Sequence, residues 1–458
     1  MGILNIPKTT VNISDVYAGK NSISFRIPDG FIFYEKLANT IHFGKEDNLR
    51  ALQSKAEAVN YNPRFESDSL KKCKSKKLES LLLNVTESCN LSCSYCIYSG
   101  NYQNERTENN TNMRLETAKK AIDTFMPLSK NNTLIGFYGG EPLNNINLVR
   151  RIIDYVREAY PRKSVVFSMT TNFCKADKYA RDLIENEISI TMSLDGPKQV
   201  HDKYRRFKNG RLTYNKIIDN LKKFQEISPK YVRTHILQNV TCEDLEDLPE
   251  IVRFFQQNKQ FRVSRISKVE PKGLIAKTEK SSKDSNVFSF ASDYLSSIFS
   301  REDPRILRIF FDQKLKEVAI RSKKVMPEEL MLNGCCYPSN RKLFVDTDGK
   351  FYMCEKFGRR LSIGNVNTGI DQQAINESID RFAKIRNNYC TEGCWAQRLC
   401  NACIQFSKDP AGDISEQGLS QICDSTKNQI LMGLANYVIL TKENKKLLED
   451  YIKSIEFK

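Results

Sequence analysis

Three cysteines stand close together early in the chain, with the spacing Cys-x3-Cys-x2-Cys. They are Cys89, Cys93 and Cys96, in the stretch SCNLSCSYC. Three thiolates on one short loop can hold three irons of a 4Fe–4S cluster and leave the fourth iron open to a small molecule. A zinc site is the alternative interpretation, although no fourth Cys or His lies nearby in the sequence.

A second group of cysteines follows residue 330. Because the chain has 14 cysteines, only three histidines and no recognisable export signal, it favours thiolate-bound iron over disulfides and His-containing zinc sites. A pair of structural zinc sites is the alternative for this group. Cys73, Cys174 and Cys242 are interpreted as small buried or incidental thiols. The second group comprises Cys335, Cys336, Cys354, Cys390, Cys394, Cys400, Cys403 and Cys423.

Short apolar runs alternate with segments of helical periodicity between the two groups. This βαβ repetition indicates an α/β protein with a parallel sheet, and six strands suit a partial, TIM-like (β/α)6 barrel. The predicted strands are 81–86, 133–138, 164–170, 188–194, 232–240 and 261–266, and the predicted helices are 113–126, 147–160, 178–187, 214–227 and 247–258.

The residues that could do chemistry follow the first four of these strands. The three cysteines come after the first strand and Gly139-Gly140-Glu141-Pro142 after the second. Thr171-Asn172 follows the third strand, and Asp195-Gly196 follows the fourth. The carboxyl ends of parallel strands meet at one edge, where barrel enzymes place their sites. The sequence therefore predicts a single site at that edge.

The cysteine loop, with Tyr95 before its last cysteine, and the Gly139–Pro142 run together resemble the radical S-adenosylmethionine (SAM) superfamily. The resemblance implies a 4Fe–4S cluster whose open iron binds the amine and carboxylate of SAM. It implies SAM cleavage to a 5′-deoxyadenosyl radical that takes a hydrogen from the substrate. It also implies that the backbone carbonyls of Gly139, Gly140, Glu141 and Pro142 accept hydrogen bonds from the SAM amine.

The same resemblance implies further SAM contacts. Tyr95 would lie near the adenine, and Ser193 and Asp195 would face the ribose or the methionine end. Arg205 or Arg206 would pair with the carboxylate. The structural alternatives are core packing for Tyr95, a strand-end turn for Ser193 and Asp195, a basic surface for the arginines and a helix cap for Glu141. We also assign Thr171 and Asn172 to the cofactor site.

The second cysteine group resembles the SPASM extension of radical SAM enzymes that modify peptides and proteins. The resemblance implies two auxiliary 4Fe–4S clusters, and so three in total. The spacing in the family is C-x2-C-x5-C-x3-C, whereas this chain has C-x3-C-x5-C-x2-C from Cys390 to Cys403. By the order of the family, the outer cluster would bind Cys390, Cys394, Cys400 and Cys423. The inner cluster would bind Cys354, Cys403 and one or both of Cys335 and Cys336.

Two details of this extension carry hypotheses of their own. If only one of Cys335 and Cys336 is a ligand, the inner cluster has an open iron that could bind a substrate thiolate. Glu355 follows Cys354 in a hairpin predicted at Asp348-Gly349, and the resemblance to sulfatase-maturing enzymes implies a catalytic base near this place. An exposed hairpin residue is the alternative for Glu355.

The chain divides into four predicted parts. Residues 1–78 form a β-rich module with a hairpin around Pro28-Asp29-Gly30, followed by a helix at 47–60. In peptide-modifying relatives such a module often captures a leader peptide as an added strand; a simple β-extension or a dimerisation arm is the alternative. Residues 79–300 form the barrel, 301–330 a bridging region, and 331–458 the auxiliary-cluster domain with a C-terminal helix.

Composition narrows the class of protein. The formal net charge of +16 comes from 71 Lys and Arg against 55 Asp and Glu. It fits a solvated surface, partly offset by anionic clusters, or an anionic partner. A non-catalytic nucleic-acid-binding protein is a disfavoured alternative because of the motifs above. No apolar run reaches the ~18 residues of a membrane span. We expect a cytoplasmic protein that binds neither nucleic acid nor membrane.

The leading functional prediction is a maturase of a ribosomally made peptide, forming a thioether between a Cys sulfur and a carbon atom. Its expected partners are a Cys-containing precursor with a leader sequence and an electron donor of the flavodoxin or ferredoxin type. The alternatives are formylglycine formation in a sulfatase and carbon–carbon cyclophane formation on a peptide.

Overall fold

The computed structural model describes most of the chain. The described residues are 13–61, 63–67, 77–100, 106–268, 314–321, 329–330, 341–390, 393–409, 411–443 and 445–456. Cys73 and the two predicted inner-cluster ligands Cys335 and Cys336 lie outside these ranges. So does most of the predicted bridging region 301–330.

An eight-stranded sheet with the order β11-β10-β9-β8-β7-β6-β13-β14 forms the centre of the molecule. Its six successive strands from β6 to β11 are parallel, which confirms the predicted α/β fold. The bounds are β6 (Leu78–Thr86), β7 (Ser129–Gly139), β8 (Ser164–Thr171), β9 (Ser189–Ser193), β10 (Ile236–Cys242) and β11 (Val263–Lys268).

Two strands from the C-terminal region extend this sheet. Strand β13 (Lys342–Val345) lies parallel to β6, with Phe344 beside Leu82. Strand β14 (Phe351–Tyr352) returns antiparallel to β13 through the hairpin predicted at Asp348-Gly349. The second cysteine group is therefore attached to the same sheet as the first.

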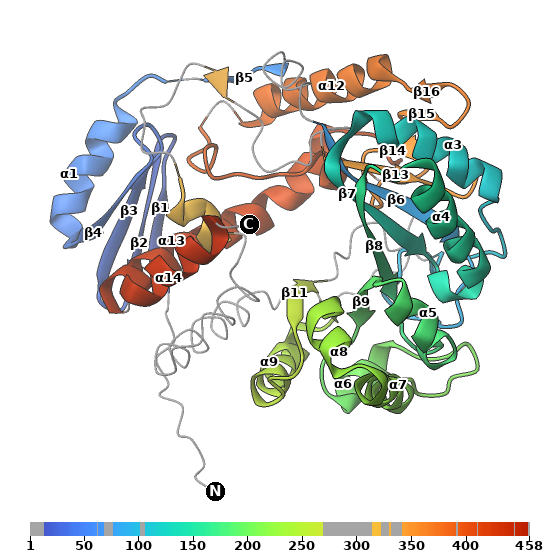
Figure 1. Cartoon of the computed structure of the whole chain (residues 1–458). Coiled ribbons are helices and arrows are strands. Elements are labelled where there is room, and N and C mark those ends of the chain that lie inside the picture. Colours follow the sequence, from blue (N-terminus) through green and yellow to red (C-terminus); the bar gives the residue numbers. More distant parts are fainter. Residues whose placement is uncertain are drawn as a thin grey trace, which may run out of the picture.

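Helices cover the outer face of the parallel strands (Figure 1). In β6, the alternate residues Leu81, Leu83 and Val85 are fully buried in one core with Ile122 and Phe125. This is the pattern of a strand with one face against helices. The helices are α3 (Leu115–Phe125), α4 (Ile146–Ala159), α5 (Ala180–Glu185), α6 (Lys198–Tyr204), α7 (Tyr214–Ile227), α8 (Pro229–His235) and α9 (Leu248–Gln257).

The predicted strand 232–240 is wrong in its first half. Residues 232–235 belong to helix α8, and strand β10 starts only at Ile236. Ser228 caps this helix by accepting a hydrogen bond from the Tyr231 amide at 3.3 Å, and Pro229 occupies its first turn. The serine cap and the proline thus favour a helix more strongly than the β-branched residues after them favour a strand.

The N-terminal region forms a four-stranded antiparallel sheet, β1-β2-β3-β4. The predicted hairpin is confirmed between β2 and β3. Ile23, Phe25 and Tyr34 face a core shared with Trp395 and Leu434, so the sheet lies against the C-terminal region (Figure 1). The bounds are β1 (Ser14–Ala18), β2 (Ser22–Ile27), β3 (Gly30–Glu35), β4 (Thr40–Gly44) and α1 (Glu46–Glu57), which covers the other face.

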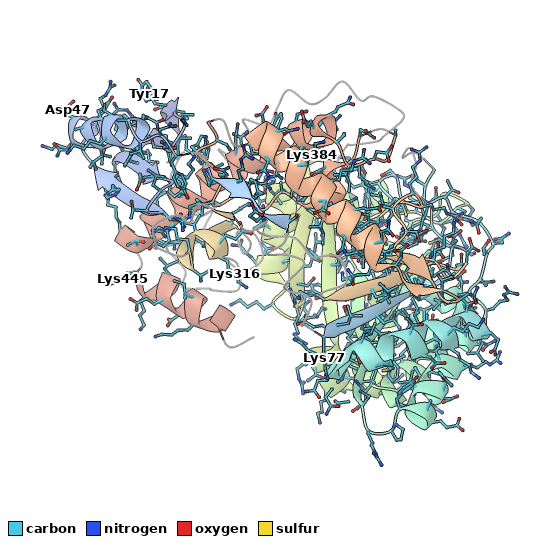
Figure 2. All side chains as sticks on the ribbon, turned by 90° about the horizontal axis from the view of Figure 1, so that it is seen from above. Tyr17, Asp47, Lys77, Lys316, Lys384 and Lys445 are labelled. Atoms are coloured by element: carbon cyan, nitrogen blue, oxygen red, sulfur yellow. The ribbon has the colours of Figure 1, made fainter. Side chains whose placement is uncertain are left out.

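The remaining elements belong mostly to the C-terminal region. They are β5 (Arg64–Phe65), β12 (Glu329–Leu330), β15 (Gly364–Asn365), β16 (Gly369–Ile370), α12 (Gln372–Cys390), α13 (Glu416–Glu443) and α14 (Lys445–Glu456). None of the helices in the described ranges combines the length and apolar character that crossing a bilayer requires. Figure 2 shows Lys384 on α12, Lys445 on α14 and Lys77 beside β6, so these basic side chains come from separate elements.

The loop after β7 is held against the end of β6 by its backbone. The amide of Gly140 donates to the Thr86 carbonyl at 2.8 Å, and the amide of Glu141 donates to the Ser88 carbonyl at 2.9 Å. A Cβ on Gly140 would meet the Ser88 oxygen at 2.4 Å, and one on Gly139, whose φ is +136°, would meet the Thr86 oxygen at 2.1 Å. Only glycines allow this approach.

We expect Gly140→Ala to destabilise the protein by about 1–3 kcal/mol, because the new methyl group overpacks against backbone that cannot yield. Urea unfolding followed by circular dichroism measures the change. Gly44→Ala is the matched control, since a Cβ there meets no atom within 4 Å. Equal stability of the two variants would contradict the close approach.

Candidate functional site

The cysteine loop begins directly after β6. Backbone amides donate to two of its sulfurs, Leu91 to Cys89 and Tyr98 to Cys96, each at 3.4 Å. Asn172, at the end of β8, donates its Nδ2 group to the Cys89 sulfur at 3.7 Å. Donors aimed at sulfur favour the thiolate form that binds metal.

Burial makes bare thiolates costly in this loop. It raises the pKa of the Cys89 thiol to about 12, and the Glu141 and Cys93 charges add to the rise. Burial likewise raises the pKa of the Cys93 thiol to about 11, while Arg205 opposes the rise. A bound cationic iron centre would reverse this balance and keep the thiols ionised. Three neighbouring half-buried thiols therefore fit a 4Fe–4S cluster.

A buried ionic group adjoins the loop. The hydroxyl of Tyr95 donates to the Asp195 carboxylate and accepts a hydrogen bond from Nη1 of Arg205 at 2.6 Å. The second oxygen of Asp195 accepts from the Thr241 amide at 2.9 Å. Burial raises the pKa of Asp195, and Arg205 opposes that rise. The group thus holds a guanidinium beside the cysteines.

Of the two arginines considered for the SAM carboxylate, only Arg205 has its guanidinium buried beside the cysteines, whereas Arg206 contacts the loop through its backbone carbonyl, which accepts from the Ser92 amide at 2.8 Å. Arg205 is buried, and its Nε has no hydrogen-bond partner among the described residues. Arg206 is exposed, and its Nε donates to the Asp202 carbonyl at 2.9 Å. A buried guanidinium with a spare N–H suits a carboxylate ligand.

His201 supports this group and was not singled out from the sequence. Its Nδ1 accepts from the Asp195 amide at 3.3 Å, and its Nε2 lies 3.0 Å from Oγ1 of Thr213. The Thr213 hydroxyl in turn donates to the Arg205 carbonyl at 2.8 Å. Burial lowers the pKa of His201 to about 3. The ring is therefore neutral and ties the backbones of Asp195 and Arg205 together.

Glu141 and Thr171 bind each other through their side chains. The buried Glu141 carboxylate accepts hydrogen bonds from the Thr171 hydroxyl and the Asn172 amide, both at 2.7 Å, and from the Leu143 amide at 3.0 Å. The helix-cap alternative for Glu141 is thus confirmed. These side chains position the strand-end loops, so the contacts left to this segment are those of its backbone.

The other predicted cofactor-site residues lie at the same sheet edge. Gly139 ends β7, and the buried Pro142 opens the short turn that follows. Ser193 is buried at the end of β9, two residues before Asp195. The structure therefore brings together the residues that the sequence placed after four different strands.

Four cysteines of the second group lie near one another. Burial raises the pKa of the Cys390 thiol to about 12; Arg386 opposes the rise, and charges on Cys394, Cys400 and Cys423 add to it. These are the four residues assigned to the outer cluster. They come from the end of α12, the segment before residue 401, and α13.

Cations from three elements surround these four thiols. Arg386 lies on α12, and Lys427 on α13 interacts with the sulfur of Cys423. Lys36, from the turn between β3 and β4, is fully buried; burial lowers its pKa, and the nearby Cys394 charge opposes that fall. Its Nζ donates to the Lys20 carbonyl at 3.2 Å and to Gln397 at 3.4 Å. Nothing in the sequence pattern pointed to Lys36, because its partner Gln397 lies 361 residues away.

Cys354 and Cys403, assigned to the inner cluster, are also neighbours. Burial raises the pKa of the Cys354 thiol to about 12, and the adjoining Glu355 and Cys403 add to the rise. Glu355 is not the exposed hairpin residue of the alternative. Its side chain is 15 % exposed and accepts a hydrogen bond from Lys342 at 3.0 Å. Burial raises the pKa of Glu355 but the paired Lys342 lowers it further, so the carboxylate is ionised.

Within the described ranges, no three His, Cys, Asp or Glu side chains converge as tightly as one shared metal ion requires.

Comparison with known proteins agrees with this arrangement. Residues 83–254 match the profile of the Radical SAM superfamily. The chain is 24 % identical over 350 residues to a cysteine-type anaerobic sulfatase-maturating enzyme of Clostridium novyi, covering 73 % of this chain and 90 % of the relative.

Solved structures share the fold. A structure described as native anSMEcpe with bound AdoMet superposes with a TM-score of 0.56 at 20 % identity, covering 78 % of this chain and 98 % of the other. Native anSMEcpe with bound AdoMet and Cp18Cys peptide superposes with a TM-score of 0.53 at 18 % identity, covering 78 % and 99 %. Residues 83–254, which carry the cysteine loop, thus form a radical SAM domain, and the chain is a SAM-dependent iron–sulfur enzyme.

Proposed function

We propose that this enzyme modifies a cysteine-containing, ribosomally made peptide and closes a thioether between a cysteine sulfur and a carbon atom. One observation carries the proposal. Strand β13, which leads to Cys354, lies directly beside β6, which leads to the Cys89 loop. Because β14 returns antiparallel to β13, Cys354 lies level with Lys342 and with Ser80, toward the amino end of β6, whereas the Cys89 loop follows the carboxyl end. The two thiol groups therefore lie at opposite ends of the same strands, and a substrate held between them would lose a hydrogen atom at one end and an electron at the other.

The residues of the chain have separate tasks in this proposal. When bound, SAM and the clusters supply the radical that takes a hydrogen atom and the acceptor for the electron that the substrate gives up. Arg205 pairs with the SAM carboxylate, and Tyr95 and Asp195 hold the guanidinium in place. The carbonyls of Gly139–Pro142 accept from the SAM amine. Cys335 or Cys336 completes the inner thiol group. The electrons come from a flavodoxin or ferredoxin.

Oxidation of a cysteine to formylglycine is the second candidate. The sulfatase-maturating relative favours it, and so does the ionised Glu355 directly after Cys354, where a base could accept a proton. The two reactions differ in the fate of sulfur. A thioether keeps the sulfur and loses two hydrogens, whereas formylglycine formation releases the sulfur as sulfide.

The N-terminal sheet could bind the leader of the precursor. Strand β1 is an edge strand, and all of its residues are exposed. An exposed edge offers unpaired backbone groups to an added strand. We propose this edge as the leader site; one face of the sheet is occupied by the C-terminal core.

The first test is SAM cleavage by the anaerobically reconstituted protein with dithionite. We expect 5′-deoxyadenosine and about twelve irons per chain, the content of three clusters. The triple variant Cys89→Ala/Cys93→Ala/Cys96→Ala should lose 5′-deoxyadenosine and about four irons. Bound zinc without 5′-deoxyadenosine would refute the proposal.

Removal of Arg205 should weaken SAM binding while the clusters remain. We expect Arg205→Met to raise the Kd for SAM about tenfold or more, because a charge-assisted pair with the carboxylate is lost. Equilibrium binding of labelled SAM measures it, with iron content as the check on folding. Arg206→Gln, one residue away and exposed, is the control and should bind SAM normally.

The product separates the two candidate reactions. Candidate precursor peptides should lose two hydrogens and one free thiol on incubation with enzyme, SAM and reductant, without sulfide release. Mass spectrometry and a sulfide assay decide between the products. If Glu355 is the base of formylglycine formation, Glu355→Gln should abolish sulfide release, whereas Glu377→Gln, exposed on α12, should not. Sulfide release with a gained carbonyl would assign the second reaction.

A further inference from the structure

Arg106 is a buried cation without a charged partner in the described residues. Its side chain is 1 % exposed, and Nη1 donates to the Glu355 carbonyl at 3.1 Å. Its Nε and Nη2 groups have no hydrogen-bond partner there. By contrast, Arg359 is 46 % exposed and pairs with the carboxylate of Glu87 at 3.0 Å. A buried, unpaired guanidinium is costly, so its persistence calls for a partner from outside these residues.

Two aromatic rings hold the guanidinium in place. Its central carbon lies 4.5 Å from the ring centroid of Phe344 and 4.8 Å from that of Tyr352. Contact with ring faces is favourable for a cation but satisfies no N–H group. The side chain is thus fixed by stacking while two donors stay available.

This stacking places Arg106 at the inner face of the sheet. Phe344 pairs in register with Leu82 of β6, and laterally paired residues project to the same face. The neighbours of Leu82 along the strand, Leu81 and Leu83, project to the other face. Phe344, and Arg106 stacked on it, therefore lie on the face opposite Leu81 and Leu83.

Two other buried polar groups without partners lie on the same side. Asn84 is in register with Tyr138, whose ring contacts Phe344 at 6.2 Å, and neither polar atom of its amide has a partner in the described residues. The hydroxyl of Tyr98 is likewise unpartnered there. Tyr98 is two residues past Cys96, and its carbonyl accepts from the Glu108 amide at 2.7 Å, which brings its segment alongside Arg106. The proximity of Arg106 opposes the rise that burial causes in the Tyr98 pKa.

We propose that Arg106 binds a carboxylate of the substrate, from an Asp or Glu side chain or from a peptide C-terminus, and so selects acidic peptides. Its two free donors match the two oxygens of a carboxylate, and a bidentate pair of this kind fixes orientation as well as affinity. Because Tyr98 follows Cys96 so closely, the bound carboxylate would lie next to the cysteine loop. The proposal rests on the proposed function in that the substrate is a peptide.

The test uses the reconstituted holoenzyme with SAM and three short capped peptides that share one cysteine. One carries an aspartate, one an asparagine in its place, and one the asparagine with a free C-terminal carboxylate. We expect the wild-type protein to bind one of the two acidic peptides about tenfold more tightly than the neutral one, as a charge-assisted pair predicts. The acidic peptide that is preferred identifies the source of the carboxylate.

Arg106→Gln and Arg106→Met should both abolish this preference. Methionine keeps apolar contact with the two rings, so it guards against loss of folding. Arg151→Gln, exposed on α4, removes the same charge elsewhere and should keep the preference.

Three outcomes would overturn the proposal: no acid preference in the wild-type protein, an unchanged preference in the Arg106 variants, or loss of cluster iron in both variants, which would make Arg106 structural. Failure of the proposed function is recognised separately, as absence of 5′-deoxyadenosine with every peptide.

Discussion

Burial of thiols is the constraint on which the rest of this structure depends. Thiols removed from water resist ionisation, yet only thiolates bind iron. The chain meets this conflict with fixed cations. Arg205 lies beside the Cys89 loop, and Arg386, Lys427 and Lys36 lie around the Cys390 group. Each cation needs its own support, and much of the surrounding polar network supplies it, from Tyr95 and Asp195 to His201.

The strand-end site could be predicted from the sequence because its signals are local. Periodicity located five of the six parallel strands closely, and the rule that parallel strands end at one edge brought the motifs together. The role of each side chain within the site was harder to predict from the sequence. The backbone of Glu141 remains a predicted cofactor contact, but the sequence did not show that its carboxylate would accept hydrogen bonds from Leu143, Thr171 and Asn172. Which loops close around one side chain is a tertiary property that spacing does not encode.

Pairings between distant segments were beyond sequence patterns. From the sequence, the residues of β13 were expected in a separate domain. Only their pairing with β6 shows that the two cysteine groups are attached to one sheet. Arg106 looked like one more residue of a basic chain until the rings of Phe344 and Tyr352 were placed around it. The strand prediction for residues 232–235 failed for the opposite reason. A local signal, the serine cap with the proline of α8, outweighed the strand propensity of the residues after it.

The packing of the N-terminal sheet on the C-terminal region has a consequence for the order in which the protein folds. Strands β2 and β3 are synthesised early, but their core is complete only with Trp395 and with Leu434 of α13, which follow more than 350 residues later. The packing around the Cys390 thiols is therefore complete only once α13 has been synthesised. The N-terminal sheet, for the same reason, cannot be exchanged between relatives without the helix that it covers.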